Sequence, residues 1–556
     1  MAKIHTLKIL NYRSIEKFEQ VFSNTNFICL IGRGDSGKTT ILNAISAVLS
    51  PNWNYNFYDT DFHNGIIENS IEIEVSLFEL PIELLTDSKF GLYKRILNNE
   101  GEIIDDLLSE ESDDNKDILT IKLIVNKDLE PKWYVINDRV HQDNIEISSS
   151  DRAKLNVFLI SDYFDRHFSW SKGTPLYSLL RQRDFEDETD KIIAEANRKA
   201  KETIKQSDSF NSFDSIIANI KKAASSLGLS IDELGALIDF KNTFVNEGNI
   251  ALHSNGIPYR LNGKGTRRLL SIAIQLELAK QGGIILIDEL EQGLEPDRAK
   301  FLAKQLKDNN KGQVFMTTHS SNVLVELDAE NIYLKNVGSE QLFSFNENFQ
   351  GCIRNNPDVF FAKKIIVCEG ATEIGICRAL NDFRIINNDE NLAVLGIALA
   401  DGKGSNFVEY CEYFRKSGFD VCAFCDSDDK AINKKKQNLQ NMGVTIVDCD
   451  DDKSIEQQLF DDLPWKNVMR LVNYAVEEKS EQSILETTAK STIKELLDHD
   501  SAKTRTLLGV KAKENGWYKR IDHGEKIGRI WFNSISNMEE KTLNIQYDNL
   551  ISWIHR

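Results

Sequence analysis

Two kinds of apolar pattern recur along the chain, and both are typical of strands. Residues 71–77 alternate apolar and polar side chains with a period of two, as a strand with one buried face does, and residues 118–125 and 133–136 are further candidates. Other short runs are apolar throughout, which is typical of strands buried on both faces. These runs occupy residues 27–31, 284–287, 314–316, 365–368 and 421–425. Because helical patterns follow several of the runs, the sequence predicts an α/β fold.

A helical pattern without strands fills the middle of the chain. From Asp184 to Ile238, apolar residues recur at helical spacing among many charges and few glycines. We expect an inserted helical segment here. It is either a projecting arm that serves dimerisation or a plain packing subdomain.

The first apolar run leads into a loop bracketed by glycines. Residues 32–40 fit the spacing G-x-x-x-x-G-K-[ST] between a strand and a helix. Glycines let backbone N–H groups turn toward phosphate oxygens, and the helix N-terminus adds partial positive charge. Lys38 is expected to reach the outer phosphates and the Thr39 hydroxyl to ligate Mg²⁺. The sequence therefore predicts an ATP-binding loop formed by Gly32, Gly34, Asp35, Ser36, Gly37, Lys38, Thr39 and Thr40.

Two later strands end in residues that complete such a site. Residues 284–287 run into Asp288 and Glu289, and residues 314–317 are soon followed by His319. In nucleotide hydrolases a carboxylate placed like Asp288 holds Mg²⁺, and one placed like Glu289 orients the attacking water. We expect His319 to sense the γ-phosphate, although a histidine at a strand end can also be purely structural.

These motifs together resemble the ABC-type ATPase head of RecF and of chromosome-maintenance proteins. The resemblance puts residues 262–268 at the signature loop, where Gly265 would contact nucleotide held by an opposing protomer. The sequence departs from the family's L-S-G-G-Q here, because Gly263-Lys264-Gly265 stands in its place. The resemblance implies a homodimer or a higher homo-oligomer.

A second set of carboxylates lies in the last third of the chain. Glu369 follows the apolar run 365–368, and Glu373 lies one helical turn later, so both can point into one cavity. Asp426 and Asp428 follow the run 421–425 directly. Carboxylates at i and i+2 beyond a strand can share a hard cation such as Mg²⁺. Each motif alone can be a helix N-terminus or a solvated loop. Together they predict a divalent-metal site at which a phosphodiester could be hydrolysed.

This pair of motifs resembles the Toprim domain, and an ABC-type head followed by Toprim resembles the OLD (overcoming lysogenisation defect) family of ATP-dependent nucleases. That family includes the nuclease subunit of Gabija anti-phage systems and retron-associated effectors. The resemblance implies that Glu369 is a metal ligand or general base and that Glu373, Asp426 and Asp428 are ligands. It also implies that Glu456 supports a second metal and that a C-terminal lysine, for which we select Lys519 before Lys513, lies near the scissile phosphate.

The expected architecture is an ABC-type P-loop ATPase head with a helical insertion, then a Toprim α/β domain and a helical C-terminal segment. Its divisions are residues 1–180 and 241–350 for the two ATPase halves, 181–240 for the insertion, 351–480 for Toprim and 481–556 for the basic C-terminal segment. The expected function is an ATP-regulated, Mg²⁺- or Mn²⁺-dependent DNA endonuclease or nickase in bacterial anti-phage defence. The partner would be DNA, with a helicase or a reverse transcriptase and its nucleic acid as possible components of the system.

Charge narrows the ways in which the chain could bind DNA. The formal net charge of −19 argues against nonspecific adhesion to DNA or to anionic membranes. A local basic segment between Lys503 and Arg529, interleaved with Trp517 and Tyr518, could follow a phosphate backbone, and so could Lys430 with residues 434–436. A pair of solvated helices would give the same pattern. No apolar stretch long enough for a transmembrane helix or a signal peptide is evident, so we expect a cytoplasmic protein.

Two other functions fit the sequence less well. One is a nucleotide-dependent DNA-binding sensor or scaffold whose Toprim domain cleaves nothing, against which the set of four carboxylates counts. The other is a topoisomerase or primase, for which neither a recognisable transesterifying tyrosine nor zinc-ribbon cysteine spacing is evident.

Overall fold

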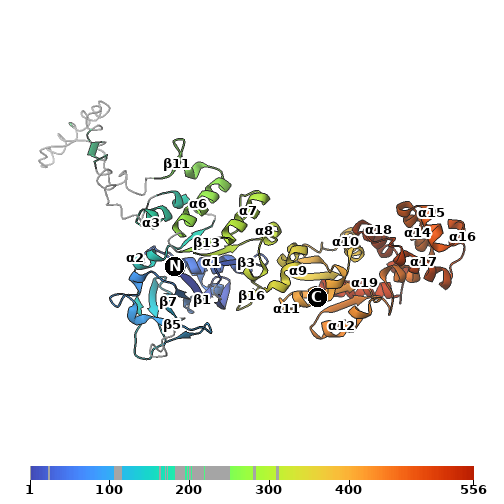
Figure 1. Cartoon of the computed structure of the whole chain (residues 1–556), viewed down its shortest axis with the longest axis horizontal. Helices are drawn as coiled ribbons and strands as arrows, with labels where there is room; N and C mark the ends of the chain where they lie inside the picture. The colour runs from blue at the N-terminus through green and yellow to red at the C-terminus, as the bar shows by residue number, and fades with distance from the viewer. Residues whose placement is uncertain are drawn as a thin grey trace. The chain divides into compact units, whose positions relative to one another are not determined.

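The computed structural model describes residues 2–22, 25–105, 115–161, 165–169, 171, 173–181, 251–279, 283–308 and 312–556, with a few isolated positions between 195 and 218. Figure 1 labels the elements along the chain. They form two compact units, one of Met1–Ile28, Thr39–Arg298 and Gln305–Thr317, the other of Cys29–Lys38, Ala299–Lys304 and Thr318–Arg556. The helical insertion predicted at 181–240 lies outside the described residues, apart from Arg181 and the isolated positions.

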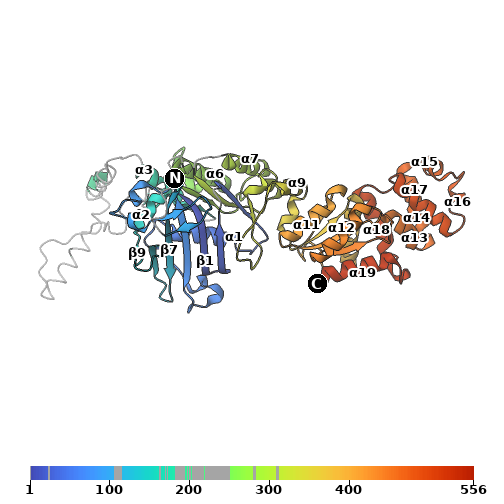
Figure 2. The same ribbon diagram turned by 60° about the horizontal axis from the view of Figure 1, so that its bottom comes forward.

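An antiparallel sheet forms most of the N-terminal region, and several of its strands are seen side by side in Figure 2. Residues 71–77 do alternate: Ile71, Ile73 and Val75 are buried, whereas Glu72 and Glu74 on the other face both bind Lys122. The strand predictions for 71–77, 118–125 and 133–136 are therefore confirmed. The strand order is β2-β1-β4-β7-β5-β6, and β8 pairs with β7 and β9. The strands are β1 (Lys3–Tyr12), β2 (Ile15–Val21), β4 (Ile71–Phe78), β5 (Arg95–Leu97), β6 (Ile103–Ile104), β7 (Lys116–Val125), β8 (Pro131–Ile136) and β9 (Ile145–Glu146).

A six-stranded sheet contains the fully apolar runs of the ATPase motifs. Its order is β10-β13-β14-β3-β15-β16. The pairs β10–β13, β13–β14 and β3–β15 are parallel, which puts the carboxyl ends of the paired strands at a common edge. The strands are β10 (Phe158–Ile160), β13 (Ile284–Ile287), β14 (Gln313–Thr317), β3 (Phe27–Ile31), β15 (Ile332–Leu334) and β16 (Phe343–Ser344), and the associated helices are α1 (Lys38–Val48), α6 (Lys264–Ala279) and α7 (Pro296–Lys307).

A four-stranded parallel sheet organises the second acidic region. Its order is β18-β17-β19-β20, so the strands that precede Glu369 and Asp426 are immediate neighbours. The strands are β17 (Lys364–Cys368), β18 (Ile397–Asp401), β19 (Asp420–Cys425) and β20 (Thr445–Asp448). The helices that follow them are α10 (Ala371–Ile386), α11 (Phe407–Lys416), α12 (Lys430–Asn441) and α13 (Ile455–Asp462).

The C-terminal helices share one hydrophobic core with this sheet. Trp517, Trp531 and Trp553 are fully buried and belong to the same cluster as Ile366 of β17 and Phe424 of β19. The residues from 481 onward are thus packed into the α/β domain instead of projecting from it. The helices are α14 (Trp465–Lys479), α15 (Glu481–Thr488), α16 (Ile493–Leu496), α17 (Ala502–Glu514), α18 (Ile521–Phe532) and α19 (Thr542–His555).

Glycines bring α10 and α18 into close contact. A Cβ on Gly524 would collide with the carbonyl oxygen of Thr372, and one on Gly375 would collide with that of Ile521. Thr372 in turn donates its hydroxyl to the carbonyl of Tyr518, at 2.8 Å. The helix that carries Glu373 is therefore fixed directly by the C-terminal helices.

Candidate active sites

The phosphate loop curls around its own lysine. Gly32 (φ +134°) and Gly37 (φ +97°) adopt backbone conformations that side chains disfavour, and a Cβ on Gly32 would lie 2.5 Å from the carbonyl oxygen of Lys335. The buried Lys38 donates from Nζ to the carbonyls of Gly32 (2.9 Å) and Arg33 (2.8 Å). The ammonium therefore lies inside the loop that is expected to surround phosphate oxygens.

The remaining loop residues differ in exposure. Ser36 is buried and its hydroxyl lies 3.3 Å from Lys38 Nζ, whereas Gly34 and Asp35 are exposed. Thr40 lies in the first turn of α1 and shares a 3.1 Å hydrogen bond with the hydroxyl of Ser14.

The predicted Mg²⁺ ligands of the nucleotide site lie in contact with each other. Thr39 Oγ1 donates to Asp288 Oδ1 at 3.1 Å, and Thr317 Oγ1 donates to the same oxygen at 2.7 Å. Thr317 Oγ1 also accepts the backbone N–H of Glu289, at 2.7 Å. A hydroxyl and a carboxylate side by side are the oxygen ligands that Mg²⁺ takes in P-loop hydrolases.

Arg268 supports this turn, although sequence reasoning gave it no role. It is fully buried in α6, donates from Nη2 to the carbonyls of Asp288 and Glu289 (2.8 Å to the latter), and donates from Nη1 to Gln292 Oε1 at 2.9 Å. Glu289 itself has a left-handed backbone (φ +49°), which the guanidinium contact helps to hold. The only sequence signal was a second arginine in the 262–268 motif.

Gly265 lies at the start of a helix, and His319 lies just beyond the end of a strand. Gly265 is in the first turn of α6, where a Cβ would collide with the carbonyl oxygen of Gly293. His319 follows β14, and its ring lies 6.1 Å from that of Phe361, tilted by 43°. Both residues lie at the helix start and strand end that their sequence motifs predicted. Their roles in nucleotide binding stay predictions.

The acidic strand ends of the four-stranded sheet meet at one edge. Glu369 Oε2 accepts the backbone N–H of Asp426 at 3.0 Å, so the two carboxylates lie on the same side of the sheet. Asp426 Oδ1 accepts the N–H of Ile455, at 2.7 Å, which brings the start of α13 to the same point. Glu373 Oε2 accepts the N–H of Gly370 at 3.0 Å. Residues from three separate stretches of sequence thus form one acidic cluster.

Two lysines border the acidic cluster. Glu456 on α13 is fully buried, neither of its carboxylate oxygens accepts a hydrogen bond among the described residues, and Lys519 Nζ lies 3.6 Å from Oε1. Asp428 Oδ2 lies 2.5 Å from Lys513 Nζ. The two lysines selected from the sequence therefore both reach the cluster, each at a different carboxylate.

Burial controls the protonation of the cluster. Burial, with the charges of Glu456 and Glu369 acting in the same direction, raises the pKa of Glu373 to about 7. Burial also raises the pKa of Asp426 well above its usual range, and that of Glu369 more modestly because the Asp426 N–H opposes it. The carboxylates around Lys519, Glu456 first, raise the pKa of its ammonium although burial acts against them. When all of its carboxyl groups are ionised, the cluster carries more negative charge than Lys513 and Lys519 neutralise.

The donor set fits a hard divalent cation. Every candidate ligand is a carboxylate oxygen, and the oxygens of buried Glu456 accept no hydrogen bond among the described residues and have only the ion pair with Lys519. Within the described ranges, no three acidic, histidine or cysteine side chains converge on one point as they stand. One oxygen each of Glu369, Glu373 and Asp426 accepts a backbone N–H, and Asp428 forms an ion pair with Lys513.

Two family models match the chain. The AAA ATPase domain matches residues 2–324, which is more than half of the sequence. The overcoming lysogenization defect protein-like TOPRIM domain matches residues 360–428, which contain Glu369, Glu373, Asp426 and Asp428.

The chain belongs to the AAA ATPase domain family and carries an OLD-like Toprim domain.

This order of domains confirms the resemblance to the OLD family inferred from the motifs. The OLD-like chain is thus an ATPase and a metal-dependent nuclease. No curated protein matches it. No helix among the described residues is long and apolar enough to cross a bilayer.

Several solved structures are similar at low identity. They are an SmcHead bound to the C-winged helix domain of ScpA (15% identity, 62% of this chain and 97% of that one, TM-score 0.34), an Smc head domain with an extended coiled coil bound to the C-terminal domain of ScpA from Pyrococcus furiosus (16%, 64% and 98%, 0.35), and the recombination mediator protein RecF-ATPrS (12%, 62% and 98%, 0.33).

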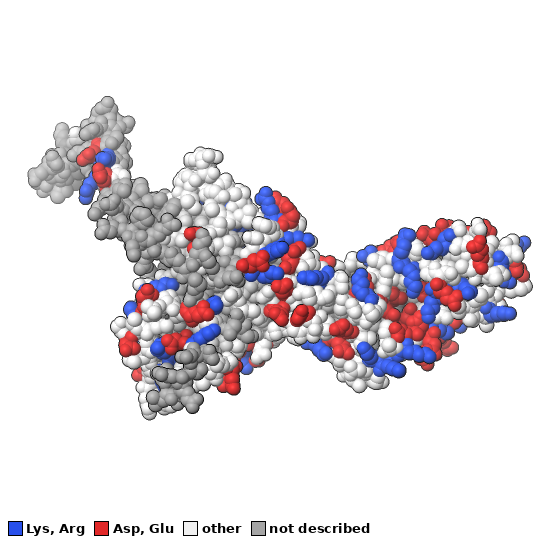
Figure 3. Space-filling model, in the orientation of Figure 1, with Lys and Arg blue, Asp and Glu red and all other residues white. Residues whose placement is uncertain are grey.

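The predicted basic and aromatic surface of the OLD-like chain requires correction. Trp517 and Tyr518 are buried at 1% and 0% exposure, so they pack the core and cannot stack on bases. On the face drawn in Figure 3, Lys and Arg over the C-terminal helices are interspersed with Asp and Glu. Several of these cations are engaged in ion pairs; Lys511 binds Glu514, Arg520 binds Asp522 and Arg529 binds Asp382. The segment is a mixed-charge helical surface with buried aromatics.

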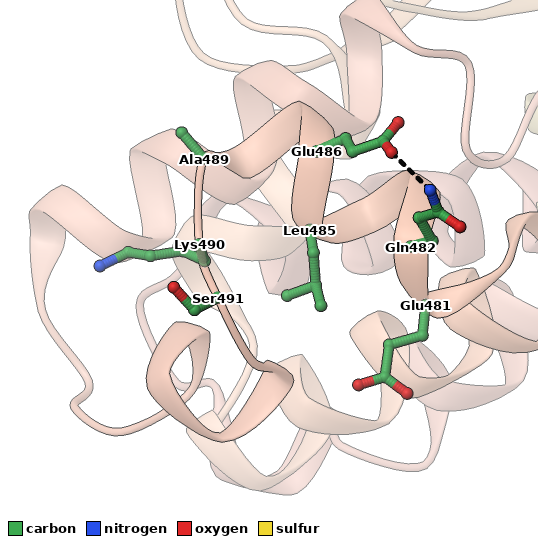
Figure 4. Close-up of a pocket in the computed structure, with 7 residues that line it drawn as sticks. All are labelled: Glu481, Gln482, Leu485, Glu486, Ala489, Lys490 and Ser491. Atoms are coloured by element: carbon green, nitrogen blue, oxygen red, sulfur yellow. Dashed lines mark hydrogen bonds between the residues drawn. The ribbon is translucent and has the colours of Figure 1, made fainter.

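A surface hollow along α15 lies outside both the nucleotide site and the acidic cluster. It is lined by residues of Glu481–Ser491, among which Gln482 Nε2 donates to Glu486 Oε1 at 2.8 Å (Figure 4). It contains none of the predicted site residues. Its exposed carboxylates, Glu481 and Glu486, are suitable positions for control substitutions.

Proposed function

We propose that the chain is an ATP-regulated, Mg²⁺-dependent DNA endonuclease or nickase that serves bacterial defence against phage. The observation that carries the proposal is the hydrogen bond from Asp426 N to Glu369 Oε2, because it joins the two acidic strand ends of the Toprim sheet. The role in defence rests on the OLD family resemblance. DNA as substrate and a homodimer as the active form are parts of the same proposal.

The residues of the cluster have complementary roles in this proposal. Glu369, Glu373, Asp426 and Asp428 would hold a divalent cation, with Glu456 available to a second one. Such a cation lowers the pKa of bound water and neutralises charge on a phosphodiester. Burial shifts the pKa of Glu369 upward, toward neutrality, which suits a group that accepts a proton from water.

Lys519 is the group best situated to meet the substrate. Its side chain is 58% exposed, yet its ammonium lies 3.6 Å from the buried Glu456. A cation in this position can face a phosphate oxygen on the solvent side while staying at the metal site. Lys513, which forms an ion pair with Asp428, would become available for the same use if Asp428 ligated a metal.

A plasmid assay tests the proposal. Supercoiled DNA is incubated with the full chain and Mg²⁺ or Mn²⁺, with and without ATP. We expect nicked or linear product from the wild type, a loss of about 100-fold or more in Glu369→Gln and in Lys519→Ala, and an altered response to ATP in Lys38→Ala. Glu481→Gln, at an exposed carboxylate of the α15 hollow (Figure 4), is the matched control and should cut normally. Normal cutting by Glu369→Gln would refute the proposal.

One observation favours a non-cleaving alternative, a nucleotide-dependent DNA-binding sensor or scaffold. Asp428 is neutralised by Lys513, and the described carboxylates do not converge on one point as they stand. If the protein turns over ATP and binds DNA but cuts no DNA with either metal, the alternative is correct.

A further inference from the structure

Lys436 differs from the lysines beside it on α12. Lys434 and Lys435 are exposed, as expected of side chains that could hold a DNA strand. Lys436 is 12% exposed and turned into the protein, beneath the loop of residues 426–429. Its ammonium therefore belongs to the interior of the Toprim domain.

The ammonium of Lys436 has three oxygen partners. It donates to the backbone carbonyl of Asp426 at 3.0 Å, to Ser427 Oγ at 3.1 Å and to Asp448 Oδ2 at 2.9 Å. An ammonium has three donors, so all of them are used. Asp426 follows β19 and Asp448 ends β20, so this one group ties together the ends of two adjacent strands.

The rest of the loop is fastened around the same point. Ser427 is 3% exposed, its N–H donates to the Lys453 carbonyl at 2.9 Å, and its hydroxyl donates to the Cys449 carbonyl at 2.7 Å. Asn433 Nδ2 donates to the Ser427 carbonyl, at 2.6 Å. With Ser427 held inward, the carboxylates on either side of it, Asp426 and Asp428, lie at the acidic cluster.

We propose that Lys436 is a positioning residue that sets the loop carrying Asp426 and Asp428 in the arrangement that binds a divalent cation. The inference rests on the proposed function, since it concerns the same site. It excludes Lys436 from the DNA-holding role that the sequence suggested for residues 434–436. The groups that would act on DNA from α12 are Lys434 and Lys435.

Two physical effects of removing Lys436 have opposite signs, which makes the proposal testable. Removing a positive charge near a cation site strengthens cation binding by Coulomb attraction. Losing the group that orients metal ligands weakens binding, by about 10–100-fold in known sites. A positioning role requires the second effect to exceed the first.

The test measures Mn²⁺ binding directly, by isothermal titration calorimetry and by the Mn²⁺ electron paramagnetic resonance signal, on the full chain without DNA. Lys436→Met keeps the length of the side chain without its charge or donors, and we expect Mn²⁺ binding about tenfold weaker than in the wild type. Lys436→Arg keeps the charge and should recover part of the loss. Lys416→Met, at a lysine of α11 whose side chain is 54% exposed, is the matched control and should bind Mn²⁺ as the wild type does.

Unchanged or tighter Mn²⁺ binding by Lys436→Met would overturn the inference. Should that variant not fold, as judged by circular dichroism, Ser427→Ala replaces it, since it removes one acceptor of the ammonium and should weaken Mn²⁺ binding several-fold; wild-type binding by a folded Ser427→Ala would also overturn the inference. If the wild type binds no Mn²⁺, the proposed function and the inference both fail. If the wild type binds Mn²⁺ and the variants bind it equally well, the inference fails and the proposed function is unaffected.

Discussion

At the scale of residues, Glu373 shows how strongly the site depends on a cation. Burial and the nearby carboxylates raise the pKa of Glu373 to about 7 and that of Asp426 well above its usual range. Both groups therefore take up protons on folding. At a pH where all of them are ionised, the buried negative charge destabilises the folded state until a metal balances it.

This charge predicts how stability depends on pH. A carboxyl group whose pKa is higher in the folded than in the unfolded state makes the folded state bind more protons between the two values, so stability falls as pH rises through that interval. In EDTA we expect the contribution of Glu373 to fall between about pH 4.5 and 7 and to stay low above it. Mn²⁺ should then raise the Tm more at pH 8 than at pH 6.

Thermal unfolding followed by circular dichroism, with EDTA or Mn²⁺ across this pH range, checks the expectation. Glu373→Gln is the informative variant, because it removes the titrating group while keeping the size of the side chain. Its Tm should depend less on pH than that of the wild type. An identical pH dependence in the two proteins would show that Glu373 is not the group involved.

At the scale of elements, α10 and α18 form one support for the acidic cluster. Their contact is made through Gly375 and Gly524, where backbone meets backbone. Glu373 lies on α10 between Thr372 and Gly375, the two residues that contact α18, so a shift of α10 moves a carboxylate of the site. The C-terminal helices consequently determine the geometry of the nuclease site through packing as well as through Lys519.

Gly524→Ala tests this support. The added methyl would collide with the Thr372 carbonyl, and overpacking of this kind costs about 1–3 kcal/mol or more. We expect a lower Tm together with weaker Mn²⁺ binding, measured by calorimetry. Gly263→Ala is the control, since a Cβ there meets no heavy atom within 4 Å. If Gly524→Ala has the same Tm as the wild type and binds Mn²⁺ with the same affinity, α18 does not support the site.

The sequence predicted those elements whose pattern is local. The apolar runs before Gly32, Asp288, Glu369 and Asp426 are strands. The parallel pairing of β17 with β19 is consistent with the βαβ pattern of this region. Whether a side chain on a helix or in a turn faces the core or the solvent is not local information. Trp517 therefore looked like a base-stacking residue and Lys436 like a surface cation, although tertiary packing turns both inward. Arg268 was missed for the same reason.

At the scale of the whole molecule, two chemical sites occur in one chain. One joins Thr39 to Asp288 and the other joins Glu369 to Asp426. The AAA ATPase and OLD-like Toprim matches assign them to different domains. Control of one by the other therefore has to be measured on the full chain.

Glu289→Gln tests whether ATP binding drives dimerisation of the chain. Loss of the water-orienting carboxylate should lower the rate of ATP hydrolysis by about 100-fold or more while ATP still binds. We expect this variant to accumulate as a homodimer in ATP, measured by light scattering after gel filtration. Lys38→Ala, which removes the phosphate-loop ammonium, should not respond to ATP. Equal masses for Glu289→Gln with and without ATP would contradict nucleotide-driven assembly.

The acidic cluster brings together Glu369, Asp426, Glu456 and Lys519, which lie far apart in sequence. Contacts of such long sequence separation require the closure of large loops and form slowly during folding. Local helices therefore appear well before these four side chains meet. A newly made or partly folded copy therefore holds no complete acidic cluster, and we expect metal binding at this cluster only once folding is finished.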